Sequence, residues 1–486
     1  MKYVGSDWGI VGVVDLNLQR NDFYKKEITF QVSCSYGPGR YDEKYEQGNQ
    51  DYPYGYVRWT QQRNFEAVLT AIQSKQLKVN NLITDRFCID DAIAAYDKVQ
   101  NDPNSLGVIL KYSESIDTSD VIKVAQNKSV VNSSQAVVGV IGAGNFSKGV
   151  LLPALAATSA ELAYIADLNG VVARHAAKKF NALHATTDYK KILEDDKVKA
   201  VFIVVGHNLH ARFICEALRA DKHVFVEKPL ALNKDELKIV VDSAKKAGGK
   251  AIMVGFNRRF SPHIVKIKEL IKNRIEPLCM NMTVNAGFIP ADSWVQDTER
   301  GGGRIIGEVC HFIDLLLFLT GSEVENVSAM NVTGHIPVCS DKMSIMLKFA
   351  DGSIGTINYF ANGSKSYPKE MLEIFSDGRV IRMENFKTTR GYGFINFRKY
   401  KTLRQDKGHK NEIRAFINNI INGGKPLISF EQIVNVTKST FAALDSASTN
   451  RTILLKQDIQ QQHSQWTLSN LSYNCPQQYI TCETVK

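Results

Sequence analysis

Residues 137–147 read Val137-Val-Gly-Val-Ile-Gly-Ala-Gly-Asn-Phe-Ser147, and no other segment indicates the fold class as clearly. It is a short apolar run, typical of a buried strand, that leads into two closely spaced glycines and then into a helical pattern. A turn of this kind brings backbone N–H groups close to a pyrophosphate at the start of a helix. The residues expected to hold a dinucleotide are Gly142, Gly144, Asn145, Phe146 and Ser147. Ser147 stands where a third glycine is common.

A second apolar strand, Leu162-Ala-Tyr-Ile-Ala166, ends in Asp167. A carboxylate at this place accepts hydrogen bonds from the ribose 2′-hydroxyl and repels a 2′-phosphate. Asp167 therefore favours NAD over NADP as the cofactor. The alternative is that Asp167 only caps the helix that begins near Asn169.

The region around these motifs alternates between strand and helix patterns. Strands are expected near residues 137–141, 162–166, 200–205, 223–226 and 251–255, and helices at 147–157, 170–180, 208–219 and 234–247. This rhythm predicts an α/β domain with a parallel, Rossmann-type sheet over residues 136–256. The polar, serine-rich stretch 113–135 before it is expected to be a linker.

The pattern changes after residue 256. Longer alternating strands with hairpin signals at Asp351-Gly352 and Asp377-Gly378 predict an antiparallel sheet. Helices at about 305–319, 410–422 and 430–447 are expected to complete an α+β domain over residues 257–461. Its open sheet face is expected to pair copies of the chain into a homo-oligomer. Residues 462–486 are expected to form an irregular tail.

The overall composition excludes several classes of protein. A chain of 486 residues is too long for one ordinary core, so two or three domains are expected. There is no apolar run of about 18 residues and no signal-peptide pattern, which predicts a cytoplasmic protein without membrane contact. The eight cysteines form no C-x-x-C pair, so no metal site is expected. The formal charge of +10 is spread out and accompanies no nucleic-acid reader motif, so nucleic acid is not an expected partner.

Further motifs follow the glycine turn in a fixed order. They are Glu227-Lys-Pro229, Gly255-Phe-Asn-Arg-Arg-Phe260, Gly301-Gly-Gly303 leading to His311-x-x-Asp314, and Lys407-Gly-His-Lys-Asn-Glu-Ile-Arg-Ala-Phe416. In this order they resemble the Gfo/Idh/MocA oxidoreductases over roughly residues 136–457. The resemblance implies a Rossmann domain followed by an open-faced α/β domain, with NAD(P) and a sugar-like substrate at their junction.

The resemblance also implies roles for individual residues. Lys228 would touch a substrate hydroxyl and the nicotinamide ribose, with Glu227 on the cofactor side, and would orient the reactants for hydride transfer. His311 would be the general base that removes the hydroxyl proton as hydride leaves the same carbon. Asp314 lies one helical turn after His311 and would assist it. Outside such a motif, a histidine in an apolar helix is more often a core residue.

The sequence departs from the family pattern just before this histidine. Many relatives carry an aspartate four residues before it, whereas this chain has Gly307 there and Glu308 next to it. Glu308 and His311 are spaced i, i+3 and share a helix face. Three roles are open for Glu308: it orients the imidazole of His311, it binds substrate hydroxyls, or its side chain points away from the site.

The second departure is Gly206-His-Asn-Leu-His210, which replaces the more usual Thr-Pro or Thr-Arg in the loop on the nicotinamide side. His207 and Asn208 remain expected contacts of the cofactor. His210 either joins them or orients the helix that follows.

Three polar residues after the last strand of the parallel sheet are candidates for substrate binding. Asn257 and Arg258, with Arg259 beside them, are expected to contact the substrate or its phosphates. The alternative is that the arginines form ion pairs at the domain junction.

Residues 1–112 resemble a different family. The motifs are Asp15-Leu-Asn-Leu-Gln-Arg-Asn-Asp-Phe-Tyr-Lys-Lys-Glu27, Ser33-Cys-Ser-Tyr-Gly-Pro-Gly-Arg-Tyr41 and Arg63-Asn-Phe-Glu-Ala-Val-Leu69. They are similar to the carboxyl-terminal part of zinc-type medium-chain alcohol dehydrogenases, whose zinc ligands and glycine turn would lie before residue 1. No catalysis is therefore expected from this segment. The order of the two parts is similar to bacterial bi-domain oxidoreductases associated with surface polysaccharide synthesis, of which this chain looks like an amino-terminally shortened member.

Together the motifs predict an NAD(P)-dependent dehydrogenase or reductase. It would transfer a hydride between the nicotinamide and a carbon of a sugar or sugar nucleotide, in surface polysaccharide metabolism. The alternative is a non-catalytic protein of the same fold that binds NAD and sugar as a sensor or scaffold. The presence of both Lys228 and His311 favours the enzyme, whereas Gly307 leaves the alternative open.

Overall fold

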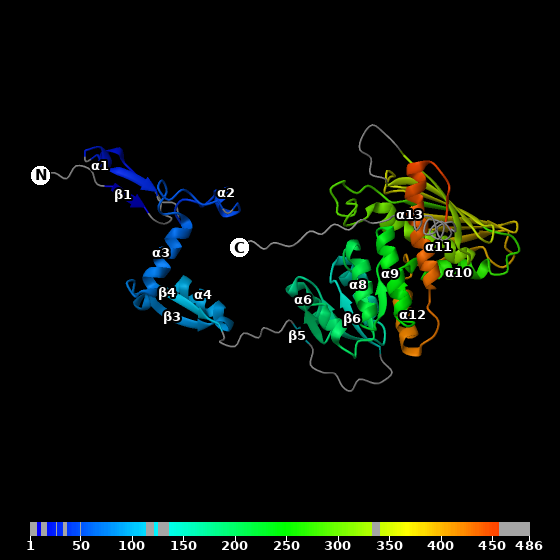
Figure 1. The fold of residues 1–486 in the computed structure, drawn as a ribbon, viewed down its shortest axis with the longest axis horizontal. Helices are drawn as coiled ribbons and strands as arrows, with labels where there is room; N and C mark the ends of the chain where they lie inside the picture. Colours follow the sequence, from blue (N-terminus) through cyan, green and yellow to red (C-terminus); the bar gives the residue numbers. More distant parts are fainter. Residues whose placement is uncertain are drawn as a thin grey trace, which may run out of the picture. The chain divides into compact units, whose positions relative to one another are not determined.

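The computed structural model describes residues 7–10, 17–25, 27–32, 36–48, 50–112, 121–124, 136–332 and 341–455. The chain divides into two compact units, Met1–Thr118 and Ser119–Lys486 (Figure 1). The predicted tail at 462–486 lies outside the described residues, as do 113–120 and 125–135 of the predicted linker.

The first unit contains two pairs of parallel strands with short helices. Its elements in the described ranges are β1 (Asp7–Ile10), α1 (Arg20–Tyr24), β2 (Thr29–Val32), α2 (Glu43–Glu46), α3 (Gln61–Gln73), η1 (Asn80–Leu82), β3 (Ile83–Cys88), η2 (Ile89–Asp91), α4 (Ala92–Asn101) and β4 (Gly107–Lys111). β1 pairs with β2, and β3 with β4, which agrees with a partial α/β segment. Among the apolar side chains described in this unit only Ala95 is buried, so the unit has little core of its own.

The second unit begins with the predicted parallel sheet. Its parallel strands are β6 (Val137–Ile141), β7 (Glu161–Ala166), β8 (His184–Thr186), β9 (Ala200–Ile203), β10 (His223–Val226) and β11 (Ile252–Val254). They lie in the order β11-β10-β9-β6-β7-β8, followed by β5 at the edge. Every residue of β6 and β9 is buried, as expected for strands that are covered on both faces.

Helices connect these strands, as the alternating pattern predicted. They are η3 (Ser147–Leu151), α5 (Leu152–Ala156), α6 (Gly170–Phe180), α7 (Lys190–Glu194), η4 (His207–Leu209), α8 (His210–Arg219) and α9 (Lys234–Lys246). The order of the strands changes direction at β6, so β7 lies on one side of it and β9 on the other. In open α/β sheets ligands bind beyond the carboxyl ends of the strands at such a point.

One part of the predicted linker is a strand. β5 (Val121–Lys123) pairs antiparallel with β8 at the edge of the sheet. The linker prediction for 113–135 is therefore wrong at these residues. Three residues are too few to show an alternating pattern in the sequence, and the segment gains its backbone partners only because the edge of the sheet is open.

The second sheet is formed by the carboxyl-terminal part of this unit. Its strands are β12 (Cys279–Asn285), β13 (Val324–Asn331), β14 (Lys342–Phe349), β15 (Ile354–Phe360), β16 (Glu370–Ser376), β17 (Arg379–Glu384), β18 (Thr388–Tyr392), β19 (Lys399–Lys401) and β20 (Ile453–Leu454). The hairpins predicted at Asp351-Gly352 and Asp377-Gly378 join β14 to β15 and β16 to β17. The sheet is antiparallel as predicted, except that β12 pairs with β15 in parallel. This pair follows from the entry of β12 after a helix rather than after a hairpin.

Helices cover one face of this sheet. They are η5 (Asn257–Phe260), α10 (Pro262–Leu270), η6 (Ile305–Val309), α11 (Cys310–Thr320) and α13 (Phe430–Thr449). α12 (His409–Asn422) instead packs on η5 and on the Rossmann domain, where the Phe416 ring lies 5.5 Å from the Phe202 ring of β9. Nearly every residue of α11 is buried, because the helix packs against α13, η5, η6 and strand β15. A Cβ at Gly355 on β15 would lie 2.7 Å from Leu316 Cδ1, which shows how closely α11 approaches the sheet. No helix in the described ranges is long and apolar enough to cross a membrane.

Candidate active site

The glycine turn after β6 is open on the side where a cofactor would bind. Gly142 has φ +99°, and a Cβ there would lie 2.2 Å from the carbonyl oxygen of Val204, so only glycine fits. At Gly144 a Cβ would meet no atom within 4 Å, and Gly144, Asn145 and Phe146 are exposed. The turn therefore offers free backbone to a pyrophosphate, as the sequence predicts.

Ser147, at the place of the third glycine, differs from its exposed neighbours. Its side chain is fully buried, and its hydroxyl makes no hydrogen bond with the described residues. A serine is small enough to let η3 pack against the sheet, which is the usual reason for glycine at this place.

Asp167 lies directly beside this turn. Its Oδ2 accepts a hydrogen bond from the backbone N–H of Ala143 at 2.8 Å, and its Oδ1 accepts one from Asn169 N–H at 2.9 Å. The residue that caps α6 is Asn169, whose Oδ1 accepts from Val171 N–H and Val172 N–H. Asp167 is thus not the helix cap itself, and its partly exposed carboxylate stands where a ribose next to the pyrophosphate would lie.

The loop after β9 is tied to the second domain. His207 Nδ1 donates to the carbonyl oxygen of Gly301 at 2.8 Å, and the N–H of Asn208 donates to Arg300 O at 3.2 Å. The imidazole of His207 is 7% exposed and lies edge-on to the Trp294 ring, with a centroid distance of 4.9 Å. Burial, helped by the positive charge of Lys228, lowers the pKa of His207 to about 3.

His210 has the structural role that the sequence left open. It is fully buried, with Nδ1 2.7 Å from Pro229 O and Nε2 3.2 Å from Val205 O. It links the loops that follow β9 and β10, and so it fixes the segment that carries Lys228. Asn208, by contrast, is exposed.

Glu227 and Lys228, at the end of β10, face different surroundings. The carboxylate of Glu227 packs against Gly255, where a Cβ would lie 2.9 Å from Oε1, and burial raises the pKa of Glu227 to about 7. The charge of Lys228 opposes the effect of burial on the pKa of Glu227, and it also lowers the pKa of His207 and of His311. No ion pair joins the two described side chains, so a simple Glu227–Lys228 salt bridge is not what holds the lysine.

His311 is a buried neutral imidazole. It is 7% exposed, and its ring lies 6.3 Å from the Phe256 ring. Burial, with the positive charges of Arg258 and Lys228, lowers the pKa of His311 well below its usual value. Its Nδ1 is buried without a hydrogen-bond partner among the described residues. The ring is therefore in the unprotonated form that a general base requires.

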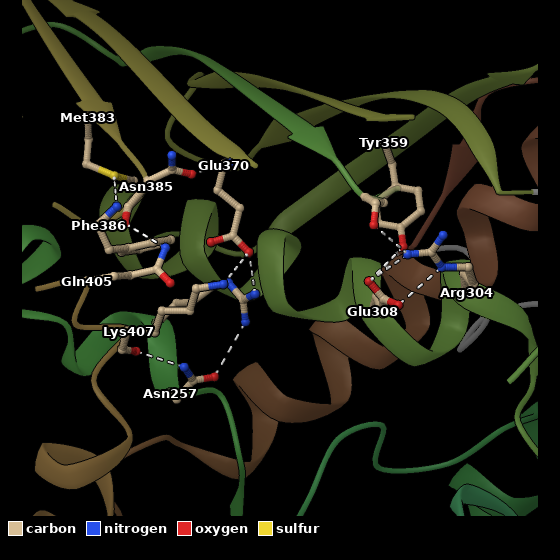
Figure 2. Close-up of polar contacts among 12 residues, drawn as sticks. Asn257, Arg304, Glu308, Tyr359, Glu370, Met383, Asn385, Phe386, Gln405 and Lys407 are labelled. Atoms are coloured by element: carbon tan, nitrogen blue, oxygen red, sulfur yellow. Dashed lines mark hydrogen bonds and ion pairs between the residues drawn. The ribbon is translucent and has the colours of Figure 1, made fainter. Parts of the chain in front are cut away.

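The Glu308 carboxylate binds Tyr359 and Arg304 and does not orient His311. Its Oε2 accepts a hydrogen bond from the Tyr359 hydroxyl at 2.7 Å, and its Oε1 accepts one from Arg304 Nε at 3.2 Å (Figure 2). Burial raises the pKa of Glu308, but the Arg304 guanidinium and the Tyr359 hydrogen bond outweigh this effect and bring it below its usual value. Glu308 is an ionised group that links η6 to β15.

Asp314 is held by Arg259. Both groups are buried, Arg259 Nε donates to Asp314 Oδ2 at 3.0 Å, and Nη2 donates to Oδ1. This two-bond ion pair joins η5 to α11. The predicted assistance of Asp314 to catalysis is thus indirect in this geometry, since both carboxylate oxygens face the guanidinium.

The predicted substrate residues are also tied within the protein. Arg258 Nη2 donates to Glu370 Oε1 at 2.7 Å, and Lys407 Nζ donates to the same oxygen at 3.1 Å. Asn257 Nδ2 donates to Lys407 O at 2.8 Å (Figure 2). Asn257 and Arg258 thereby anchor the segment before α12, and the ion-pair alternative for both arginines matches these contacts.

Comparison with known proteins identifies this pair of domains. Residues 137–256 match the family described as the Gfo/Idh/MocA oxidoreductase family with an NAD-binding Rossmann fold, and residues 265–381 match the Gfo/Idh/MocA C-terminal domain. This part of the chain belongs to the Gfo/Idh/MocA family. Its amino-terminal half is an NAD-binding domain.

Several known dehydrogenases are similar to this chain over about two thirds of its length. The myo-inositol 2-dehydrogenase of Thermotoga maritima is 27% identical over 66% of this chain and 99% of its own length. The D-xylose 1-dehydrogenase (NADP+) 2 of Haloferax volcanii is 24% identical over 65% and 99%. The structure of levoglucosan dehydrogenase with NADH and levoglucosan is similar at 25% identity, with a TM-score of 0.59, over 66% of this chain and 100% of that one.

Three residues near this Gfo/Idh/MocA site were missed in the sequence. Glu370 on β16 and Tyr359 on β15 carry no motif, and only the fold brings them to Arg258 and Glu308. His409 lies inside the quoted Lys407–Phe416 motif, so a signal existed. Its ring lies 5.9 Å from that of Phe146, and burial, with the charge of Arg258, lowers the pKa of His409 to about 4.

Proposed function

We propose that the chain is an NAD-dependent dehydrogenase that oxidises a carbinol carbon of a cyclic polyol or sugar, or reduces the matching carbonyl. The observation that carries this proposal is the buried imidazole of His311, whose Nδ1 has no hydrogen-bond partner among the described residues and whose pKa is lowered by burial and by the charges of Arg258 and Lys228. A base and a cation this close suit the removal of a proton from a hydroxyl whose oxygen Lys228 holds.

The residues have separate tasks in this mechanism. Bound NAD, held at Gly142–Ser147 with Asp167 on the ribose, supplies the hydride acceptor. Lys228 donates a hydrogen bond to the substrate oxygen and fixes the carbon that reacts. His311 takes the hydroxyl proton while the hydride leaves the carbon, so that alcohol becomes carbonyl. Glu227, His207 and Asn208 are the residues that the sequence predicts beside the nicotinamide end of the cofactor.

The substrate class rests on the relatives, whose names specify myo-inositol, D-xylose and levoglucosan. The resemblance of residues 1–112 to a zinc-type alcohol dehydrogenase, in front of this module, supports the narrower proposal of a sugar nucleotide in surface polysaccharide metabolism. Pairing of two chains through the open face of the second sheet remains part of the proposal. That face carries exposed apolar side chains such as Met346, Ile354 and Phe375.

The test begins with calorimetric titration of the full chain with NADH and NADPH. Micromolar binding with NADH preferred is the expected result. Formation of NADH is then followed with NAD and myo-inositol, D-xylose, levoglucosan or UDP-hexoses, and turnover that disappears in His311→Asn is expected. Tight NADH binding without turnover of any probe would favour the non-catalytic sensor instead.

A further inference from the structure

The tautomer of His207 is fixed by its surroundings. Nδ1 lies 2.8 Å from the carbonyl oxygen of Gly301, and a carbonyl oxygen can only accept, so Nδ1 carries the proton. The pKa of about 3, caused by burial and the charge of Lys228, keeps the ring neutral over the physiological range. Nε2 therefore presents a lone pair.

This lone pair has no partner within the protein. The side chain is 7% exposed, yet Nε2 takes part in no hydrogen bond with any residue that the structure describes. Nε2 is not among the buried polar atoms of the described residues, so it is accessible and can accept a hydrogen bond from a donor that a ligand brings. The ring lies beside Gly307, one helical turn before His311, since a Cβ there would lie 3.1 Å from Cε1, and the charge of Lys228 helps burial to lower the pKa of the ring.

Gly307 makes room for this imidazole. A Cβ at Gly307 would lie 3.1 Å from His207 Cε1 and 3.5 Å from Nδ1. Trp294 covers the ring from another side at 4.9 Å. Gly307 and His207 are two separate departures from the family pattern in the sequence. In the structure they are adjacent, and the missing side chain of Gly307 leaves room for the His207 ring. The space next to Gly307 is filled by a side chain that comes from the Rossmann domain.

We propose that His207 is a substrate-binding residue whose Nε2 accepts a hydrogen bond from a polyol hydroxyl next to the carbinol that reacts. This rests on the proposed function. It assigns His207 to the substrate instead of the cofactor, and it specifies a vicinal diol as the group that is recognised. Because the imidazole is neutral, it accepts the hydrogen bond from the hydroxyl without adding a negative charge beside Lys228.

The first test measures the imidazole directly in the full chain. The ¹⁵N signals of His207 are identified by their loss in His207→Gln, and are followed from pH 5 to 8. Protonated Nδ1, bare Nε2 and no titration in this range are expected. With NADH bound, addition of myo-inositol, D-xylose or levoglucosan should shift the Nε2 signal, since an NADH–alcohol complex cannot react further. A protonated Nε2, or an Nε2 signal that no polyol moves, would overturn the inference.

The second test separates substrate from cofactor binding. His207→Phe, which keeps an aromatic ring but removes both the Nε2 acceptor and the Nδ1 donor to Gly301 O, should raise KM for the polyol about 10- to 100-fold. The KM for NAD should change less than about twofold, and His207→Gln, which retains an acceptor, should recover part of the loss. A rise confined to the KM for NAD would return His207 to the cofactor. If the wild type turns over none of the polyols, the proposed function fails, while the Nε2 measurement still decides the inference.

A third variant acts on His207 through its neighbour. Gly307→Ala forces the imidazole to move by a few tenths of an ångström, so the polyol KM should rise about tenfold, an effect of the size found for residues in direct contact. In the His207→Ala background the same change should have little effect, because the ring it displaces is gone. Equal effects in both backgrounds would show that Gly307 acts independently of His207, and would contradict the arrangement proposed.

Discussion

The two halves of the site use their polar groups in opposite ways. In the Rossmann half, Gly144, Asn145 and Phe146 are exposed, and the space above Gly144 is free of protein atoms. In the second domain, the charged groups bind one another: Arg258 with Glu370, Arg259 with Asp314, and Arg304 with Glu308. The difference teaches that charge at a domain junction does not by itself identify a ligand contact.

Where the two domains meet, a few side chains are not used up by ion pairs among the described residues, and they come from both domains. Lys228 is partly buried at the end of β10, and His311 and His207 are imidazoles whose pKa is lowered by burial and also by nearby positive charges, including that of Lys228. The ion pairs around them fix helices and loops, so that these few side chains are held in place.

The largest effect is expected in the open half. Gly144→Val places a branched side chain where the pyrophosphate would approach, so NADH binding should fall below detection in calorimetry, a loss of at least about 100-fold. Gly55→Val is the matched control, since a Cβ there also meets no atom within 4 Å but lies in the first unit. Unchanged NADH affinity in Gly144→Val would mean that the turn does not hold the cofactor.

Lys228→Ala tests the free charge where the two domains meet. Turnover should fall about 10²- to 10⁴-fold, because the substrate oxygen loses both its donor and its electrostatic support. NADH affinity should stay within a few-fold, which separates this variant from Gly144→Val. The measurement is steady-state kcat together with calorimetric Kd. Turnover equal to that of the wild type would remove Lys228 from the mechanism.

Asp314→Asn tests the paired groups. It leaves the Arg259 guanidinium buried without its counter-charge, which should cost about 3–5 kcal/mol of unfolding free energy in urea titration. Asp445→Asn, which breaks the exposed pair with Lys234, should cost at most about 1 kcal/mol. A large loss of kcat in Asp314→Asn without loss of stability would give Asp314 the catalytic role that the sequence suggested.

The sequence predicts turns, strands and helices better than it predicts which strands or side chains pair across the fold. The glycine turn, the parallel strands and the α11 histidine each follow from a continuous motif, and all are found in the expected elements. Glu370 could not be anticipated as the partner of Arg258, because 112 residues separate them and the contact exists only once the second domain has folded. β5 and the parallel β12–β15 pair were missed for the same reason, since edge pairing and sheet order are tertiary choices.

The smallest expected effect concerns Asp167, which belongs to the open half but already accepts two backbone hydrogen bonds. Asp167→Ala should weaken NADH about 10-fold and leave NADPH unchanged or tighter, because a charged acceptor for the ribose and a repulsive charge are both removed. Asp167→Asn keeps an acceptor for Ala143 N–H without the charge, so it separates support of the turn from discrimination between the cofactors. If Asp167→Asn retains the full preference for NADH, the negative charge is not what distinguishes them, and Asp167 serves the turn alone.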